Sequence, residues 1–166
     1  MNGKLIAGLI AAALLGAAAF GVMRAVDAQR PKGTDTEQLL RMLAQGEAAA
    51  ERRDAPSVCR LISENYSDSL GFSDSSVKYN IRSYIQEHRT IELTIPREKI
   101  QVRISPDGKT GNVDFLLIQH SRGGGAAEMP ISLKVAREPV HYFLMFPGEE
   151  WRVTAADGYM GMAGVF

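Results

Sequence analysis

Asp114 and His120 are the side chains best suited to acid–base chemistry, and both fall in a mostly apolar stretch, residues 113–120. A carboxylate that burial removes from water gains basicity, so Asp114 would act as a general base if it faced a pocket. Side chains six positions apart on a regular strand point to the same face. At roughly 3.3 Å per residue, about 20 Å would separate these two along the strand, which rules out a direct dyad.

The opposite orientation also fits this stretch, because either alternating set of side chains could form the core face. The even set is Asp114, Leu116, Ile118 and His120, and the odd set is Val113, Phe115, Leu117 and Gln119. If the odd set faces the core, Asp114 points outward near the start of a strand and His120 lies at the rim of the sheet.

Three aromatic residues, Tyr66, Tyr84 and Trp151, are candidates to line a ligand-binding pocket. A tyrosine hydroxyl in such a pocket could also donate a hydrogen bond to an oxyanion. The alternative is packing, since buried tyrosines usually find one hydrogen-bond partner and a tryptophan commonly anchors a core.

The sequence predicts neither a metal site nor a cofactor site. One cysteine, Cys59, and three scattered histidines supply no intrachain disulfide and no zinc-ligand pattern. Cys59 stands among apolar residues of a predicted helix, so we expect a buried structural thiol. Glycines 123–125 are not followed by the capped helix and Lys-Ser/Thr pair that a P-loop requires.

Three helices are predicted in the first half of the folded part. Thr34 and Glu37 have capping-box spacing, and the apolar face behind them predicts a helix up to the Asp-Ala-Pro break at 54–56. A second helix is predicted after this break, because apolar residues recur at helical spacing as far as Tyr66. The third helix is predicted over residues 74–89.

Strands are predicted in the second half, because the apolar residues change to a period of two. The predicted strands cover residues 91–95, 100–104, 113–118, 131–135, 140–146 and 151–155. Turns are predicted at 105–109 and 147–150, and a glycine-rich loop at 122–127. Helices followed by strands predict an α+β fold in which three helices cover one face of an antiparallel sheet.

The amino-terminal segment predicts where the protein works. Leu5–Met23 is an uncharged, mostly apolar run of nineteen residues, long enough to cross a bilayer as a helix. We expect a single-pass membrane anchor with the following domain outside the cytoplasm, although Arg24, Arg30 and Lys32 argue mildly against this orientation. One alternative is a signal peptide cleaved after Ala19 or, less well, after Ala28, which would release the domain as a secreted or periplasmic protein. A buried core helix is a further alternative, which the run's apolar character on every face disfavours.

Charge excludes one class of partner. Residues 34–166 hold 15 basic and 18 acidic residues, a net charge of −3. Nucleic-acid binding needs a concentrated positive surface, so we expect no nucleic-acid partner. The predicted organisation is an anchor or signal peptide with a short linker at 1–33, one domain at 34–159 and a flexible tail at 160–166.

The order of these elements resembles the nuclear transport factor 2-like superfamily, also called SnoaL-like or cystatin-like. The resemblance covers residues 34–159 and rests on the opening helix pair with its 54–56 break, the third helix, and a closing hairpin at 141–153 with Trp151 on the last strand. It implies a cone of helices packed on a strongly curved antiparallel sheet. Enzymes of this superfamily place acid–base residues inside the cone, whereas other members bind cargo or take part in membrane-anchored assemblies.

Fold alone does not choose among these functions. We expect a membrane-tethered, extracytoplasmic, non-catalytic module that binds a partner protein or a small apolar ligand through its cone or its outer sheet. One alternative is a small isomerase, dehydratase or hydrolase with Asp114 as general base. Another is a homodimer formed through the sheet.

Overall fold

The computed structural model describes residues 32–120, 125–142 and 146–158. Residues 33–138 and 150–158 belong to one compact unit, which carries the helices and most of the sheet. Lys32 and residues 139–149 belong to a second unit, in which the described stretches 139–142 and 146–149 are strand ends. The predicted membrane segment 5–23 and the tail 160–166 lie outside the described residues. None of the helices in the described ranges is both long and apolar enough to span a membrane.

Helix α2 (Asp35–Glu51) confirms the predicted capping box. The Thr34 hydroxyl accepts a hydrogen bond from the amide of Glu37 (3.3 Å), and the Glu37 carboxylate accepts one from the amide of Thr34 (2.7 Å). These bonds satisfy two amides that have no partner inside the helix. The helix buries Leu39, Met42, Leu43 and Ala49.

The end of α2 is a Schellman motif with an arginine in the left-handed position. Arg53 has φ 60°, and its amide donates to the oxygen of Ala50 (2.9 Å). The amide of Asp54 donates to the oxygen of Ala49 (2.8 Å), which completes the motif. Asp54 also caps the next helix, because its carboxylate accepts from the amide of Ser57 at 3.1 Å.

Helix α3 (Ala55–Arg60) is shorter than the spacing of apolar residues predicts, because that spacing continues as far as Tyr66. The chain leaves the helix because it pairs with the last strand. Ile62 forms a parallel bridge with Val153, and the amide of Ser63 donates to the Val153 oxygen at 2.9 Å. Helix α4 (Asp74–Glu87) follows, with Ser73 as its N-cap.

The sheet contains strands β1 (Glu92–Thr94), β2 (Gln101–Ile104), β3 (Thr110–His120), β4 (Ala126–Tyr142) and β5 (Phe146–Asp157). Its order is β1-β3-β4-β5, and β2 also pairs with β3. The pairings of β1 and β2 with β3, and of β3 with β4, are antiparallel. A short 3₁₀ helix, η1 (Arg97–Lys99), separates β1 from β2.

Two strand predictions need correction. Residues 131–135 and 140–146 were predicted as separate strands, but β4 runs through Ala126–Tyr142 and pairs with β3 at every residue from 126 to 136. Residues 147–150 were predicted as a turn, but they lie inside β5. Pro147 fits there because it is the second residue of the strand, near an end where a missing amide costs least. The predicted turn at 105–109 is confirmed, with Gly108 at φ 68°.

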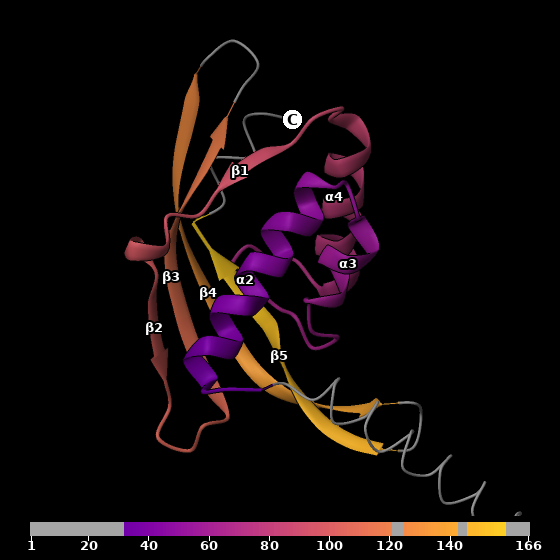
Figure 1. The fold of residues 1–166 in the computed structure, drawn as a ribbon. Helices are drawn as coiled ribbons and strands as arrows, with labels where there is room; N and C mark the ends of the chain where they lie inside the picture. Colours follow the sequence, from indigo (N-terminus) through magenta and orange to yellow (C-terminus); the bar gives the residue numbers. More distant parts are fainter. Residues whose placement is uncertain (1–31, 121–124, 143–145, 159–166) are drawn as a thin grey trace, which may run out of the picture. The chain divides into compact units, whose positions relative to one another are not determined.

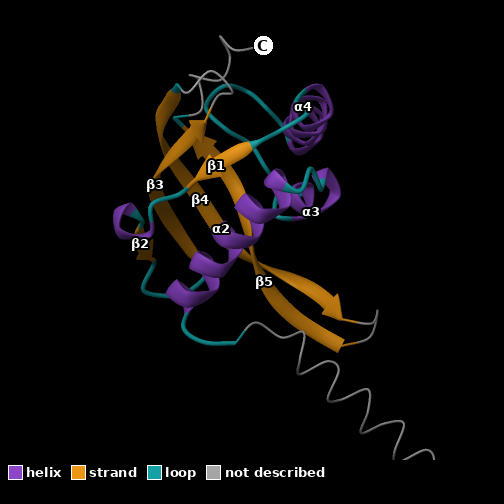
Figure 2. Cartoon of the chain, turned by 45° about the horizontal axis from the view of Figure 1, so that its top comes forward, coloured by secondary structure: helices purple, strands orange, loops and turns teal. Residues whose placement is uncertain are grey.

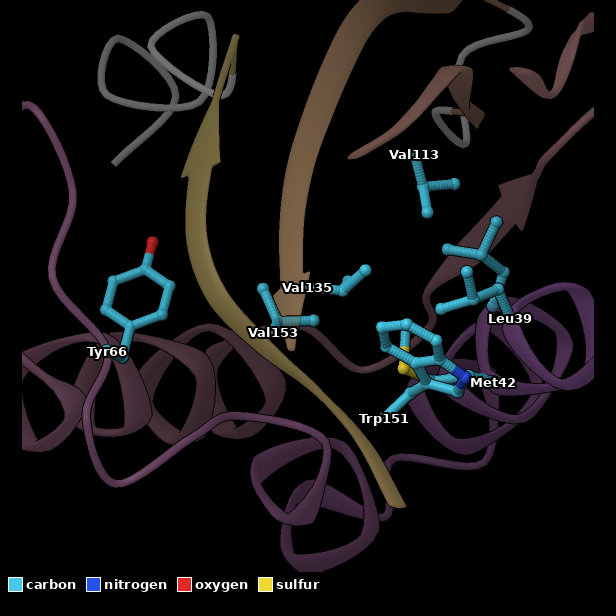
Figure 3. Packing of buried hydrophobic residues seen from close by; sticks show 8 residues of the cluster. Leu39, Met42, Tyr66, Val113, Val135, Trp151 and Val153 are labelled. Atoms are coloured by element: carbon cyan, nitrogen blue, oxygen red, sulfur yellow. The ribbon is translucent and has the colours of Figure 1, made fainter. Parts of the chain in front are cut away.

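The three helices cover one face of the sheet (Figures 1 and 2). The odd-numbered side chains of β3 and β4 face these helices, because Val113 and Val135 are almost completely buried in the core. The core cluster, drawn in Figure 3, comprises Leu39, Met42, Leu43, Tyr66, Val113, Val135, Trp151 and Val153. Even-numbered side chains of β3 and β4 therefore point to the opposite side, which we call the outer face.

Candidate functional site

An open groove lies on the outer face of the sheet, with a volume of about 720 Å³. Its lining residues are Glu98, Lys99, Gln101, Asp114, Phe115, Leu116, Glu128, Pro130, Ile131, Ser132, Asp157 and Gly158. Central strands β3 and β4 supply the middle of the groove. The 3₁₀ helix η1 with β2 flanks it on one side, and the end of β5 flanks it on the other.

The middle of the groove contains a register pair of apolar residues, Leu116 on β3 and Pro130 on β4. Leu116 is half-buried and Pro130 is exposed. The next register pair on the same face, Asp114 and Ser132, is polar. The groove therefore offers a small apolar surface with hydrogen-bonding groups directly beside it.

Asp114 lies in this groove rather than among the core residues. One carboxylate oxygen is ion-paired with Arg103, and the other accepts a hydrogen bond from the Ser132 hydroxyl at 2.5 Å. Both oxygens are thus engaged by neighbouring strands. The side chain is 31% exposed, so water reaches the carboxylate and it lacks the dry surroundings expected of a general base.

His120 is not brought to Asp114. It lies at the far end of β3, where it pairs with Glu92 and Ala126. Its Nε2 atom is 3.2 Å from the Thr94 hydroxyl, and the residue is exposed. The two candidate acid–base residues share the outer face but occupy separate environments.

Tyr66 and Trp151 both belong to the hydrophobic core (Figure 3). Tyr66 is 3% exposed and its hydroxyl donates to the Asp68 carboxylate at 2.9 Å. Trp151 is 5% exposed, and the Arg137 guanidinium lies 5.1 Å from its ring centroid. Arg137 is in turn ion-paired with Asp35 at the start of α2. These contacts are those of packing residues.

Tyr84 occupies a different place, at the contact between α4 and β3. Its hydroxyl accepts a hydrogen bond from the side-chain amide of Gln119 at 2.6 Å, and its ring stacks on His88 with centroids 4.1 Å apart. Burial raises the pKa of the Tyr84 phenol, and the Gln119 bond offsets part of that rise. The three predicted pocket aromatics are therefore split between the core cluster and this separate contact.

Cys59 is buried, as expected of a structural thiol. Its Sγ atom lies 3.7 Å from the backbone oxygen of Lys78. Burial raises the pKa of the thiol, although the positive charges of Arg82 and Lys78 act in the opposite direction. Within the described part of the chain, no three His, Cys, Asp or Glu side chains gather as metal ligands would.

The sequence pattern does not predict that the residues of η1 flank a groove. Glu98 and Lys99 belong to η1, which the alternation of apolar residues did not reveal because Pro96 interrupts it. The helix layer fixes this flank: the Glu47 carboxylate of α2 accepts from the amide of Ile95 (3.0 Å) and pairs with Arg97 (2.7 Å).

No protein-family model matches the chain, and no curated protein matches its sequence. Similar solved structures do exist. An NTF-2 like protein of unknown function from Shewanella oneidensis is 12% identical over 74% of this chain and 97% of its own, with a TM-score of 0.55. An NTF2-like protein of unknown function from Pseudomonas putida is 13% identical over 75% and 87%, with a TM-score of 0.58.

A third similar structure is Bd1075 from Bdellovibrio bacteriovorus, which is 11% identical with a TM-score of 0.58. The match covers 74% of this chain but spans only 39% of Bd1075. Identities this low carry information on fold and not on activity. The helices and antiparallel sheet of the described residues have the nuclear transport factor 2-like fold.

Proposed function

We propose that this chain is a membrane-tethered, non-catalytic binding module that works outside the cytoplasm and docks a partner protein on the outer face of its sheet. The observation that carries this proposal is the position of the groove. It opens on the face that helices α2, α3 and α4 leave uncovered, whereas the face that they cover packs eight buried residues into one cluster. Tyr66 and Trp151, the aromatics predicted to hold a small ligand, are engaged in that packing.

Catalysis by Asp114 is the weaker alternative. A general base needs a free lone pair directed at its substrate, preferably away from bulk water. Asp114 has Arg103 on one oxygen and Ser132 on the other, and the groove around it is open to solvent. These contacts suit a residue that ties β2, β3 and β4 together at a binding surface.

Tethering rests on the apolar run 5–23, which the sequence supplies. The module would follow this segment after a short linker, so its binding surface would be held close to the membrane. In Bd1075 a similar fold makes up 39% of a longer chain, which fits the use of this fold as one module among others.

The experiment compares two surface variants of the full chain. Leu116→Asp places a charge in the middle of the groove, and Tyr79→Asp changes a residue on α4 that is 67% exposed. A partner identified by crosslinking in cells is purified, and its dissociation constant is measured with each variant. We expect Leu116→Asp to weaken binding at least tenfold and Tyr79→Asp to leave it unchanged.

Two results would reject the proposal. One is a partner whose affinity responds to Tyr79→Asp but not to Leu116→Asp. The other is turnover of a small substrate by the full chain that Asp114→Asn abolishes, since this would establish the enzymatic alternative.

A further inference from the structure

We infer that the groove on the outer face takes a polypeptide segment in which lysine or arginine side chains alternate with apolar ones. This inference rests on the proposed function, because it names the chemistry of the partner that the same groove would dock. It follows from the charges around the groove and from the apolar residues in its middle.

The groove carries more negative than positive charge. Its charged lining residues are Glu98, Lys99, Asp114, Glu128 and Asp157. Arg103 compensates Asp114 through their ion pair, which leaves three carboxylates and one ammonium group. In the described residues none of these three carboxylates forms a salt bridge, although Asp157 accepts a hydrogen bond from Ser69 at 2.8 Å. Glu98 on η1 and Glu128 on β4 are both exposed.

The apolar pair in the middle of the groove suits both the apolar residues of such a segment and the aliphatic stems of its basic residues. Leu116 and Pro130 are register partners and line the groove together with these carboxylates. Lysine and arginine can lay their aliphatic stems on apolar surface while their charged ends reach outward. A cationic residue above Leu116 would therefore gain both contact with the apolar pair and attraction to Glu98 or Glu128.

The size and openness of the groove favour an extended segment over an enclosed small molecule. A volume of about 720 Å³ lies within the range of roughly 300–1,000 Å³ typical of ligand sites. Because the groove is an open trough on a sheet rather than a closed cavity, a small molecule would keep much of its surface in water. An extended chain can run along the trough and continue past both ends.

The same charges argue against a second copy of this chain as the occupant. Face-to-face packing of two such grooves would bring surplus carboxylates of both copies together, and like charges across an interface are costly. Residues 34–166 also carry a net charge of −3, so two domains repel each other at long range. A basic partner would be attracted by these carboxylates and by the net negative charge of the domain.

The test uses the full chain in a nonionic detergent and three fluorescein-labelled heptapeptides. The first is Lys-Val-Lys-Leu-Lys-Val-Lys, the second replaces every lysine with glutamate, and the third replaces the valines and leucine with serine. Fluorescence anisotropy gives each dissociation constant. We expect the first peptide to bind, the glutamate peptide not to bind, and the serine peptide to bind more weakly.

Variants locate the binding surface. We expect each of three substitutions to weaken binding of the lysine peptide about twofold to fivefold, as for charge pairs that water reaches. They are Glu98→Gln, Glu128→Gln and Asp157→Asn. Glu51→Gln and Glu64→Gln are the matched controls, since both carboxylates are exposed and lie outside the groove. Raising the salt concentration should weaken binding and shrink the difference between groove variants and wild type.

Three outcomes would overturn the inference: equal affinity for the glutamate peptide, equal effects of groove and control variants, or no binding of the lysine peptide. A fourth contrary outcome comes from analytical ultracentrifugation of the full chain. If the wild type is a dimer and Leu116→Asp is a monomer, a second copy of the chain occupies the groove. The lysine peptide could show no binding while Leu116→Asp still abolishes binding of the cellular partner. In that case the proposed docking function is retained, and only the inference that the partner segment is basic is rejected.

Discussion

The guanidinium group of Arg53 donates to the backbone oxygen of Ile85, at 3.2 Å from Nε and 3.1 Å from Nη2. This contact joins the residue that ends α2 to the last turn of α4, where helical carbonyls lack partners. It also accounts for an arginine at a left-handed position that usually holds glycine. The side-chain contact offsets the steric cost of φ 60°.

Substitution of Arg53 separates these two effects. Arg53→Ala loses the contact and keeps the backbone strain, so we expect a loss of about 1–2 kcal/mol in the free energy of unfolding. Arg53→Gly loses the same contact but removes strain of about 1 kcal/mol, so it should be the more stable variant. Urea denaturation of both measures the difference. Equal stability of the two variants would contradict a strained Arg53.

Ser63 should be important for the edge of the sheet. It is 1% exposed, and its hydroxyl donates to Glu138 (2.5 Å) and accepts from the amide of Asn65 (2.8 Å). Ser63→Ala leaves both partners without this hydroxyl, so we expect a loss of about 1–3 kcal/mol in unfolding free energy. Ser69→Ala, on an exposed loop, should cost less than about 0.5 kcal/mol. Thermal and urea unfolding of the pair test this, and similar losses would refute the role given to Ser63.

Stability should fall in alkaline solution. Burial raises the pKa of the Tyr84 phenol and the Cys59 thiol above their ordinary values of 10.0 and 9.0. The folded state then holds these protons more tightly than the unfolded state. The stability from both groups is fully present below the ordinary values and is lost as pH rises through the raised ones.

Variants identify which group causes the alkaline loss. Urea unfolding at a series of pH values from 8 upward should show a shallower decline for Tyr84→Phe and for Cys59→Ala than for the wild type. Each variant is compared with its own stability at pH 8, because removing the phenol also breaks the Gln119 bond. A decline that neither substitution changes would assign the effect to other residues.

Asp114→Asn should lower the free energy of unfolding slightly and leave the affinity for the partner almost unchanged. The substitution removes the charge that pairs with Arg103 but keeps an oxygen for Ser132. Because the Arg103 side chain is 67% exposed, the ion pair is screened and we expect a loss of at most about 1 kcal/mol. Affinity for the cellular partner should change less than threefold, and a tenfold change would make the carboxylate itself a recognition element.

The tether is tested on the protein recovered from cells. A retained anchor predicts that the intact mass includes residues 1–33 and that alkaline carbonate leaves the protein in the membrane pellet. The signal-peptide alternative predicts a mature chain that begins near Phe20 or Gln29 and a protein in the soluble fraction.

Local signals in the sequence predicted the elements whose causes are themselves local. The capping box of Thr34 and Glu37 and the turn at 105–109 depend on residues a few positions apart, so they could be recognised directly. The end of α3 could not, because Ile62 and Ser63 leave the helix to pair with Val153, about ninety residues later.

The candidate site was predicted in part for the same reason. Alternation along residues 113–120 identified two possible faces, but only the packing of Val113 against the helices decides that Asp114 points outward. The flanks of the groove are brought together by tertiary structure. Lys99 and Asp157 are far apart in sequence, and no pattern in either segment indicates that they border one surface.

Glu47 helps to fix the position of one flank of the groove, although it lies on helix α2. Its carboxylate belongs to the helix layer, yet it holds Ile95 and Arg97 and thereby fixes η1 beside the groove. One flank of the groove is thus held in place by a residue on the helix-covered side of the sheet, which a partner on the outer face would not contact. If a partner docks on the outer face as proposed, substitution of Glu47 would change the position of η1, and with it the affinity for that partner, without altering a residue that lines the groove.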